Sequence, residues 1–284
     1  MYWSIVFYCF DIFFEVLNIL QKLVFLSKSF RGKKKHVEKN KNIKKVKKGE
    51  RFFLVGNGPS IKDENLTNLK NENTIFMNMG YFHKDYKQVQ PNYHVFVDPK
   101  LASGEWDIGI LDEIIELNPK VEFFLNSKWI YLDKFQTYIN DPKFKIYWIE
   151  MNMFCTRFHQ YESLNLARNT YGMGALGASI AIANYLGSKE MYLLGVESNA
   201  FCNESINKKS HFYGFNKDNN NMSSEMIYQS LFFNYLYLNG MHNCAKFSGK
   251  LNIFNCTPGG ILNMFKRVPF EKALSRGGVN NNEK

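Results

Sequence analysis

The loop at residues 56–60 reads Gly-Asn-Gly-Pro-Ser and directly follows the apolar run 52–55. Its two glycines let backbone amides approach an anion closely, Pro59 suits the first turn of a helix, and Ser60 can cap that helix. The dipole of such a helix favours a phosphate. No lysine follows as in a Walker loop, so an ordinary tight turn stays the alternative. The residues predicted here to bind a nucleotide phosphate are Gly56, Asn57, Gly58 and Ser60.

The best acid–base group is His211, which lies in the sequence Ser-His-Phe-Tyr-Gly at 210–214. Histidine titrates near neutral pH, and this one lies among aromatic residues on a predicted active-site loop. We expect His211 to move the proton in the reaction and Tyr213 to donate to a departing phosphate. The other five histidines lack comparable surroundings, and we expect them to be structural or on the surface.

Four further polar residues follow apolar runs that read as strands. The carboxyl ends of parallel strands meet at one edge of a sheet, so these residues are expected to line one cleft with the glycine loop. Glu197, which comes after a strand and a glycine, suits ribose hydroxyls or a metal. Turn formation or plain solvent exposure is the alternative for each residue taken singly. The four are Asn78, Asp98, Glu197 and Thr257.

The segment 169–177 reads Asn-Thr-Tyr-Gly-Met-Gly-Ala-Leu-Gly and opens a helix of small residues. Small side chains let such a helix approach a sheet closely. Thr170 and the glycine amides at the helix start, including that of Gly174, are expected to hold a second phosphate or the acceptor.

The elements that would position these residues alternate along the chain. Such alternation predicts an α/β fold, Rossmann-like, with a mostly parallel sheet and helices on both faces. We expect the catalytic domain to span 51–272 and the tail 273–284 to be disordered, and the Asn-rich stretch 216–221 to be a flexible loop. Strands are predicted at 52–55, 74–77, 93–97, 121–125, 144–149, 191–194 and 251–254, and helices at 60–69, 108–117, 175–186 and 223–238.

The first 30 residues are mostly large and apolar, but Asp11, Glu15 and Lys22 interrupt the run before it reaches the length of a spanning helix. Together with Asn18, these charges fall on one side of a helix whose remaining surface is apolar. We expect an amphipathic helix over 1–30 that lies on a membrane surface. Packing against the body or against a second subunit is the alternative, and a spanning helix is less favoured.

The net charge of +10 belongs almost entirely to residues 28–51, which hold twelve Lys or Arg against two Glu. The body is close to neutral, which argues against binding of nucleic acid. The basic linker 31–50 would instead bind the anionic lipids of a membrane. We therefore expect a peripheral protein on the cytoplasmic face of the cell membrane. The five cysteines lack CxxC spacing, so neither a disulfide framework nor a zinc site is expected.

Taken in order, these motifs resemble the MptE-like superfamily, named for 6-hydroxymethylpterin diphosphokinases, and the related bacterial sialyltransferases that use CMP-sialic acid. The resemblance covers about 51–272 and rests on Gly-Asn-Gly-Pro-Ser, Asn78, Val-Asp-Pro at 97–99, the run that ends at Glu197, His-Phe-Tyr-Gly at 211–214 and Thr-Pro-Gly-Gly at 257–260. The sialyltransferases imply metal-independent inverting transfer with a histidine base, and asparagines that hold CMP.

The chain departs from the sialyltransferase pattern in several places. Phe215 stands at the usual position of the base, so His211 would serve instead, and Asp98 and Asn199 replace an expected asparagine and tyrosine. We therefore expect a glycosyltransferase that uses a nucleotide-activated, CMP-linked sugar on a surface-glycan or lipid-linked acceptor, with no cofactor. One alternative is an ATP-dependent pterin pyrophosphokinase, with Mg²⁺ held by Asp98 and Glu197. Another is a membrane-tethered nucleotide-binding protein without catalysis.

Overall fold

The fold is described from a computed structural model of the 284-residue chain. The structure describes residues 2–27, 31–158, 165–171, 174–200, 209–214, 224–247 and 252–276. The stretch 216–221 and the end 277–284, for which a flexible loop and a disordered tail are predicted, lie outside these residues.

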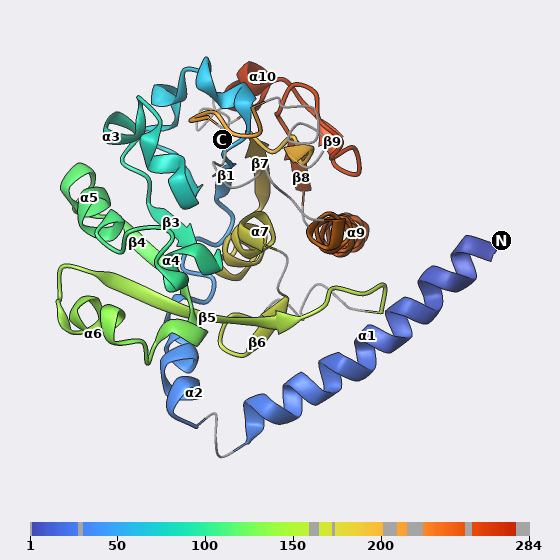
Figure 1. Ribbon diagram of the computed structural model, residues 1–284. Helices are drawn as coiled ribbons and strands as arrows, with labels where there is room; N and C mark the ends of the chain where they lie inside the picture. The colour runs from blue at the N-terminus through green and yellow to red at the C-terminus, as the bar shows by residue number, and fades with distance from the viewer. Residues whose placement is uncertain are drawn as a thin grey trace, which may run out of the picture.

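A nine-stranded sheet forms the centre of the molecule, and every neighbouring pair of strands is parallel (Figure 1). Its strand order is β6-β5-β4-β3-β2-β1-β7-β8-β9, so the chain order reverses between β1 and β7. This confirms the predicted Rossmann-like α/β fold. The strands are β1 Arg51–Val55, β2 Asn73–Met77, β3 Tyr93–Phe96, β4 Glu122–Asn126, β5 Lys145–Met153, β6 Asn169–Tyr171, β7 Glu190–Leu194, β8 Asn252–Asn255 and β9 Lys266–Arg267.

Helices cover both faces of this sheet (Figure 1). The α-helices are α1 Tyr2–Leu26, α2 Arg31–Glu38, α3 Tyr86–Val89, α4 Pro99–Ser103, α5 Ile110–Leu117, α6 Asp133–Asn140, α7 Gly174–Leu186, α9 Ser224–Phe247 and α10 Phe270–Ser275. Short 3-10 helices are η2 Lys39–Ile43, η3 Pro59–Lys62, η4 Leu66–Leu69, η5 Asn78–Phe82 and η6 Ser127–Trp129.

Strand β1 shows why the sheet needs cover on both faces. Its alternate residues point into two different hydrophobic clusters: Phe52 and Leu54 into one, Phe53 and Val55 into the other. All four side chains are fully buried. On the first face α7 packs against β1, β2 and β3, and its small residues allow the close approach that the sequence predicts. A strand buried on both faces reads as a continuous apolar run, and this pattern made β1 predictable.

The predicted helix over 60–69 is wrong, because two single turns of 3-10 helix, η3 and η4, replace it. Asn65 begins η4 by accepting a hydrogen bond from the Thr67 amide at 3.1 Å. The Leu66 amide turns away to the carboxylate of Asp85 at 2.9 Å. The turn-forming residues between the apolar positions Ile61 and Leu66 therefore end the helix early.

Residues 31–50, predicted to be a basic linker, form α2 and η2 and continue into β1. Val37, Asn40 and Ile43 are buried, and α2 packs against β5. The backbone then follows the end of α7, because the amides of Lys45 and Lys47 donate to carbonyls of α7 at 2.9 and 2.8 Å. At the other end of the chain α10 continues past residue 272, with Ala273 buried.

Helix α1 runs along the outside of the body past β5 and β6 (Figure 1). It contacts the body through the polar side of the helix. The Asn18 side chain donates to the Phe154 carbonyl at 2.9 Å and accepts from the Phe154 amide at 2.7 Å. Asp11 is buried and pairs with Arg157, whose Nε lies 2.5 Å from the carboxylate. Of the expected polar stripe, Asp11, Glu15 and Asn18 face the body, whereas Lys22 is exposed.

The apolar side of α1 faces outward as a result. In the described part of the chain, no helix is long and apolar enough to cross a membrane. The outer face of α1, a name used below for these twelve exposed residues, consists of Ile5, Phe7, Tyr8, Phe10, Ile12, Phe13, Val16, Ile19, Leu20, Leu23, Val24 and Leu26.

Replacing Asn18 by Ala should release α1 from the body. The change leaves the amide and carbonyl of Phe154 without their partner, which costs about 1–3 kcal/mol for a buried polar group. Urea unfolding should show this loss, and limited proteolysis should cut α1 faster. Ile19→Ala, one residue further and exposed, is the matched control and should change the free energy of unfolding by less than about 0.5 kcal/mol. Equal effects of the two substitutions would contradict the inward orientation.

Candidate functional site

A cavity of about 190 Å³ opens at the carboxyl ends of β1, β2 and β7. This is the point where strand order reverses, and open α/β sheets bind their ligands at such a switch point. The structure therefore defines a Rossmann-like α/β protein with a cavity at the expected place. Six predicted site residues come together in its wall: Gly56, Asn57, Gly58, Asn78, Glu197 and His211.

Asn57 joins the three segments that meet at this cavity. Its side-chain amide donates to the Met77 carbonyl at the end of β2, at 3.0 Å. Its own carbonyl accepts from the Phe212 amide at 3.0 Å, which fixes the segment 209–214 beside the loop after β1. This hydrogen bond of Phe212 places the preceding residue, His211, at the site.

Three amides of the glycine loop already donate to the end of β7 and the loop after it, which differs from the predicted phosphate cradle. Gly56 donates to the Leu194 carbonyl and Gly58 to the Gly195 carbonyl, both at 2.8 Å. The Ser60 amide donates to the carboxylate of Glu197 at 2.7 Å. In addition, η3 is one turn long, so the helix-dipole argument for a phosphate does not apply here. The loop after β7 thus occupies the positions that a phosphate would need.

This close approach of two loops requires glycine. A Cβ atom on Gly58 would overlap the Glu197 carboxylate. Gly195 has φ +60, a left-handed conformation that glycine adopts without strain, and a Cβ there would overlap the Ile61 side chain. The glycines of the Gly-Asn-Gly-Pro-Ser motif are explained by contact with the neighbouring loop.

Three residues that line the cavity instead carry acceptor oxygens without a hydrogen-bond partner. Within the described residues, the Oδ1 atoms of Asn57 and Asn78 and the Oε2 atom of Glu197 are buried and have no hydrogen-bond partner. Buried polar atoms are rarely unpaired in folded proteins, and unpaired acceptors call for a ligand that donates. Sugar and ribose hydroxyls are such donors, whereas a phosphate oxygen is not.

Asn78 is held in the cavity wall by a buried histidine that the sequence did not single out. Asn78 has φ +44, and its carbonyl accepts from His94 Nε2 at 2.7 Å. The other ring nitrogen, Nδ1, accepts from the Tyr86 hydroxyl at 2.9 Å. Complete burial lowers the pKa of His94 to about 4, so the ring is neutral and its tautomer is fixed by these two bonds.

His211 is partly buried beside the cavity, and its ring stacks on that of Tyr213 at a centroid distance of 5.1 Å. Burial lowers the pKa of His211, and the positive charge of Lys100 lowers it further. The ring is therefore neutral at pH 7 and able to accept a proton. Ser210 Oγ lies 2.9 Å from Nδ1; if Nδ1–H donates to it, Nε2 is left as the basic nitrogen.

The remaining predicted residues, Ser60 and Tyr213 included, do not line the cavity. Thr257 supports it from behind, because its hydroxyl accepts from the Val196 amide at 3.0 Å. Asp98 caps α4 by accepting from the Lys100 amide at 3.0 Å. The expectation that Asp98 lines the cavity with Asn78 is therefore wrong. Thr170 is buried in β6, which pairs with β5, and Gly174 lines a different cavity.

Sequence reasoning missed several wall residues. Ser198 and Tyr237 are joined by a hydrogen bond between their hydroxyls at 3.0 Å, and both line the cavity. Ser198 directly follows Glu197 and could have been found by proximity. Tyr237 comes from the middle of α9, and no pattern in the sequence marks it.

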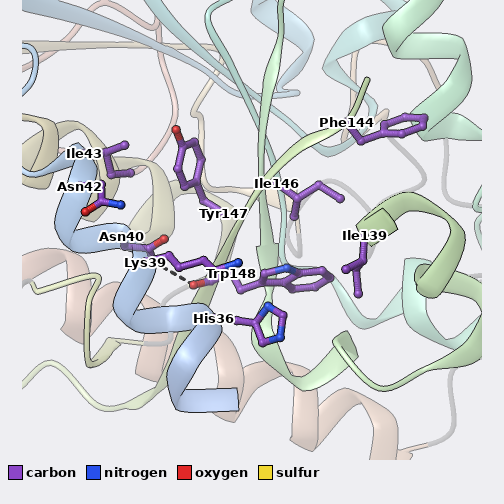
Figure 2. Close-up of a pocket in the computed structure, with 10 residues that line it drawn as sticks. All are labelled: His36, Lys39, Asn40, Asn42, Ile43, Ile139, Phe144, Ile146, Tyr147 and Trp148. Atoms are coloured by element: carbon purple, nitrogen blue, oxygen red, sulfur yellow. Dashed lines mark hydrogen bonds between the residues drawn. The ribbon is translucent and has the colours of Figure 1, made fainter. Parts of the chain in front are cut away.

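A larger cavity of about 380 Å³ lies between α2, η2 and β5, and none of the predicted site residues lines it (Figure 2). Figure 2 shows Asn40 beside the β5 backbone, where its amide donates to the Trp148 carbonyl at 2.9 Å and to the Leu166 carbonyl at 2.8 Å. These bonds attach η2 to the sheet. In the described part of the chain, no group of three or more His, Cys, Asp or Glu is arranged to hold a metal ion.

No protein-family model matches the sequence, and no curated protein matches it. The chain is similar to the structure of the sialyltransferase CstII from Campylobacter jejuni in complex with the substrate analogue CMP-3FNeuAc, with a TM-score of 0.46 and 14% identity over 78% of this chain and 88% of that one. It is also similar to the MAf glycosyltransferase from Magnetospirillum magneticum AMB-1, with a TM-score of 0.43 and 13% identity over 84% of this chain and 38% of that one.

This chain thus spans little more than a third of the length of the MAf protein. Both similarities are distant, so the function proposed below rests on the residues of this chain. Membership of the MptE-like superfamily stays a prediction.

The buried His94 predicts an acid-sensitive fold. The pKa in the folded state lies below the ordinary value of 6.5, so protonation favours the unfolded chain, and stability is lost as the pH falls from about 6.5 towards 4. Between pH 7 and pH 5 this one group should lower the free energy of unfolding by about 2 kcal/mol.

The measurement is urea unfolding at both pH values for the wild-type chain and for His94→Gln, which can still donate to Asn78 but does not titrate. The difference between the two pH values should shrink by that amount in the variant. An unchanged pH dependence would show that His94 is not the buried titrating group.

Proposed function

We propose that this chain is a glycosyltransferase that moves a sugar from a nucleotide-activated donor to a glycan or lipid-linked acceptor. The observation that carries the proposal is the meeting of a neutral, partly buried histidine with unpaired acceptor oxygens in one cavity at the switch point. A base and a set of hydroxyl-binding oxygens are what transfer to a sugar hydroxyl requires.

The donor is best taken as a CMP-linked sugar. Support comes from the motif resemblance, in which an asparagine within a glycine loop and a second asparagine hold CMP. Asn57 and Asn78 stand at those places, and both line the cavity. Glu197 adds a carboxylate oxygen that can accept from a ribose hydroxyl.

In the proposed reaction His211 takes the proton from the acceptor hydroxyl as that oxygen bonds to the anomeric carbon. The bond from this carbon to the CMP phosphate breaks, and the electron pair leaves with the phosphate. Tyr213, whose ring stacks on His211, donates a hydrogen bond to the departing phosphate. No step needs a metal ion or another cofactor.

The protein acts at the cytoplasmic face of a membrane in this proposal. Support comes from the outer face of α1, which is too large an apolar surface for a protein to leave in water without a use. The basic residues of 31–48 follow α1 directly and are mostly exposed, so they can contact anionic head groups while the helix lies in the interface.

An ATP-dependent pterin pyrophosphokinase is the second candidate, and Glu197 with its unpaired oxygen is the observation that favours it. It would need Mg²⁺ bound by Asp98 and Glu197, and Asp98 caps α4 outside the cavity. Chelation with EDTA separates the two, because only the pyrophosphokinase would lose activity. The third candidate, a membrane-tethered nucleotide-binding protein, would turn over no donor at all.

The pH profile of donor turnover tests the role of His211. Release of CMP from a CMP-linked sugar should fall as the pH drops through the pKa of His211, with a midpoint below 6.5 because burial disfavours the charged ring. His211→Gln should lose about 10²–10⁴-fold in rate and lose this acid limb. His36→Gln, outside the site, is the matched control and should keep both. A surviving acid limb in His211→Gln would remove the proposed base.

A further inference from the structure

A second cavity of about 330 Å³ lies between α1, the end of β5, the start of α7 and α9. Its floor is apolar: Phe14 and Cys155 are buried, and the Phe14 ring stacks on that of Phe154 at 4.5 Å. At the rim Phe233 is 65% exposed. An apolar cavity of about 150 Å³ is enough to bind benzene, so this cavity has room for a longer hydrocarbon.

The walls of this cavity offer few polar partners. Among the described residues that line it, Tyr237 and Asn239 are the only polar side chains apart from the thiol of Cys155. Gly174 leaves open space on the α7 side, because no described residue outside its own turn of the helix lies within 4 Å of the position a Cβ would take. A ligand that fills the cavity must therefore be mostly apolar.

Tyr237 connects this cavity to the candidate active site. It lines both cavities, and its hydroxyl hydrogen-bonds to Ser198 in the wall of the polar one. Tyr237 thus lies next to both cavities, so a hydrocarbon chain bound in the apolar one would hold an attached polar head close to the candidate active site.

The cavity also lies beside exposed apolar residues of α1 and α9. Phe7 of α1 stacks on Tyr235 of α9 at 5.7 Å, so the two helices touch at this point. On the same helix, Leu231, Phe232 and Phe233 are also exposed. If α1 and α9 lie on a membrane, a lipid hydrocarbon chain that leaves the membrane would meet the cavity at Phe233.

We propose that the cavity between α1 and α9 binds the hydrocarbon chain of a lipid-linked acceptor and so places the attached sugar beside His211. This inference rests on the proposed function for the identity of the sugar-bearing ligand. The cavity as a site for a hydrocarbon chain stands on its lining alone.

Calorimetry with the full chain tests the inference without any enzyme assay. The probes are alkyl glucosides of increasing chain length, each below its critical micelle concentration and without membranes. Each methylene that enters the cavity should tighten binding about fourfold, until the cavity is full. Leu236→Trp, which fills the cavity, should abolish this dependence on chain length. The matched control is Leu231→Trp on the same helix, where Leu231 is exposed and outside the cavity.

Phe233→Ser provides a second variant that leaves the buried core intact. It should weaken binding of the long-chain glucosides about tenfold, while Phe232→Ser, at an exposed position outside the cavity, should not. If chain-length dependence persists in Leu236→Trp, or falls equally in the controls, the glucosides adsorb to the outer helix faces and the inference is wrong.

The two proposals fail in different ways. Cavity-dependent glucoside binding by a chain that binds no nucleotide would support the hydrocarbon site and remove the glycosyltransferase. Conversely, nucleotide turnover together with glucoside binding that is unchanged in the cavity variants would support the glycosyltransferase and remove the hydrocarbon site.

Discussion

The hydrogen bond from the Ser60 amide to the Glu197 carboxylate fixes how closely the loops after β1 and β7 approach each other. Because the loops touch, neither Gly58 nor Gly195 can carry a side chain. The same contact leaves the second oxygen of Glu197 in the cavity wall. Together with the hydrogen bonds from the amides of Gly56 and Gly58, this bond holds the two loops together at the switch-point cavity.

Strands were predictable because a parallel strand covered on both faces is a short apolar run, as β1 shows. β6 and β9, with three and two residues, are too short to form a pattern. The gathering of Asn57, Asn78 and Glu197 followed from the rule that parallel strands end at one edge. His211 was expected at the site for another reason, its place on an aromatic loop. The hydrogen-bond partners of the loop amides could not be predicted from the sequence, because those of Gly56 and Ser60 are more than 130 residues away along the chain.

The sequence also identified the polar stripe of α1 but not its direction. An amphipathic pattern tells which residues share a face, and the expectation that a polar face meets water is only a rule of thumb. Here the Asn18 side chain pairs with the amide and carbonyl of Phe154 as a neighbouring strand would. The backbone therefore keeps hydrogen-bond partners at the point where the chain leaves β5. Turning the polar side inward exposes the apolar side, and it brings Phe14 to the floor of the cavity beside α9.

The central claim is that unpaired oxygens of Glu197 and Asn57 accept hydrogen bonds from nucleoside hydroxyls. The most direct measurement is calorimetric titration with CMP and with its 2′,3′-dideoxy analogue, which differ only in those two hydroxyls. A hydrogen bond to a charged group contributes about 1.5–3 kcal/mol, so the analogue should bind at least about tenfold more weakly. Equal affinity for the two nucleotides, or no binding of CMP, would contradict the account.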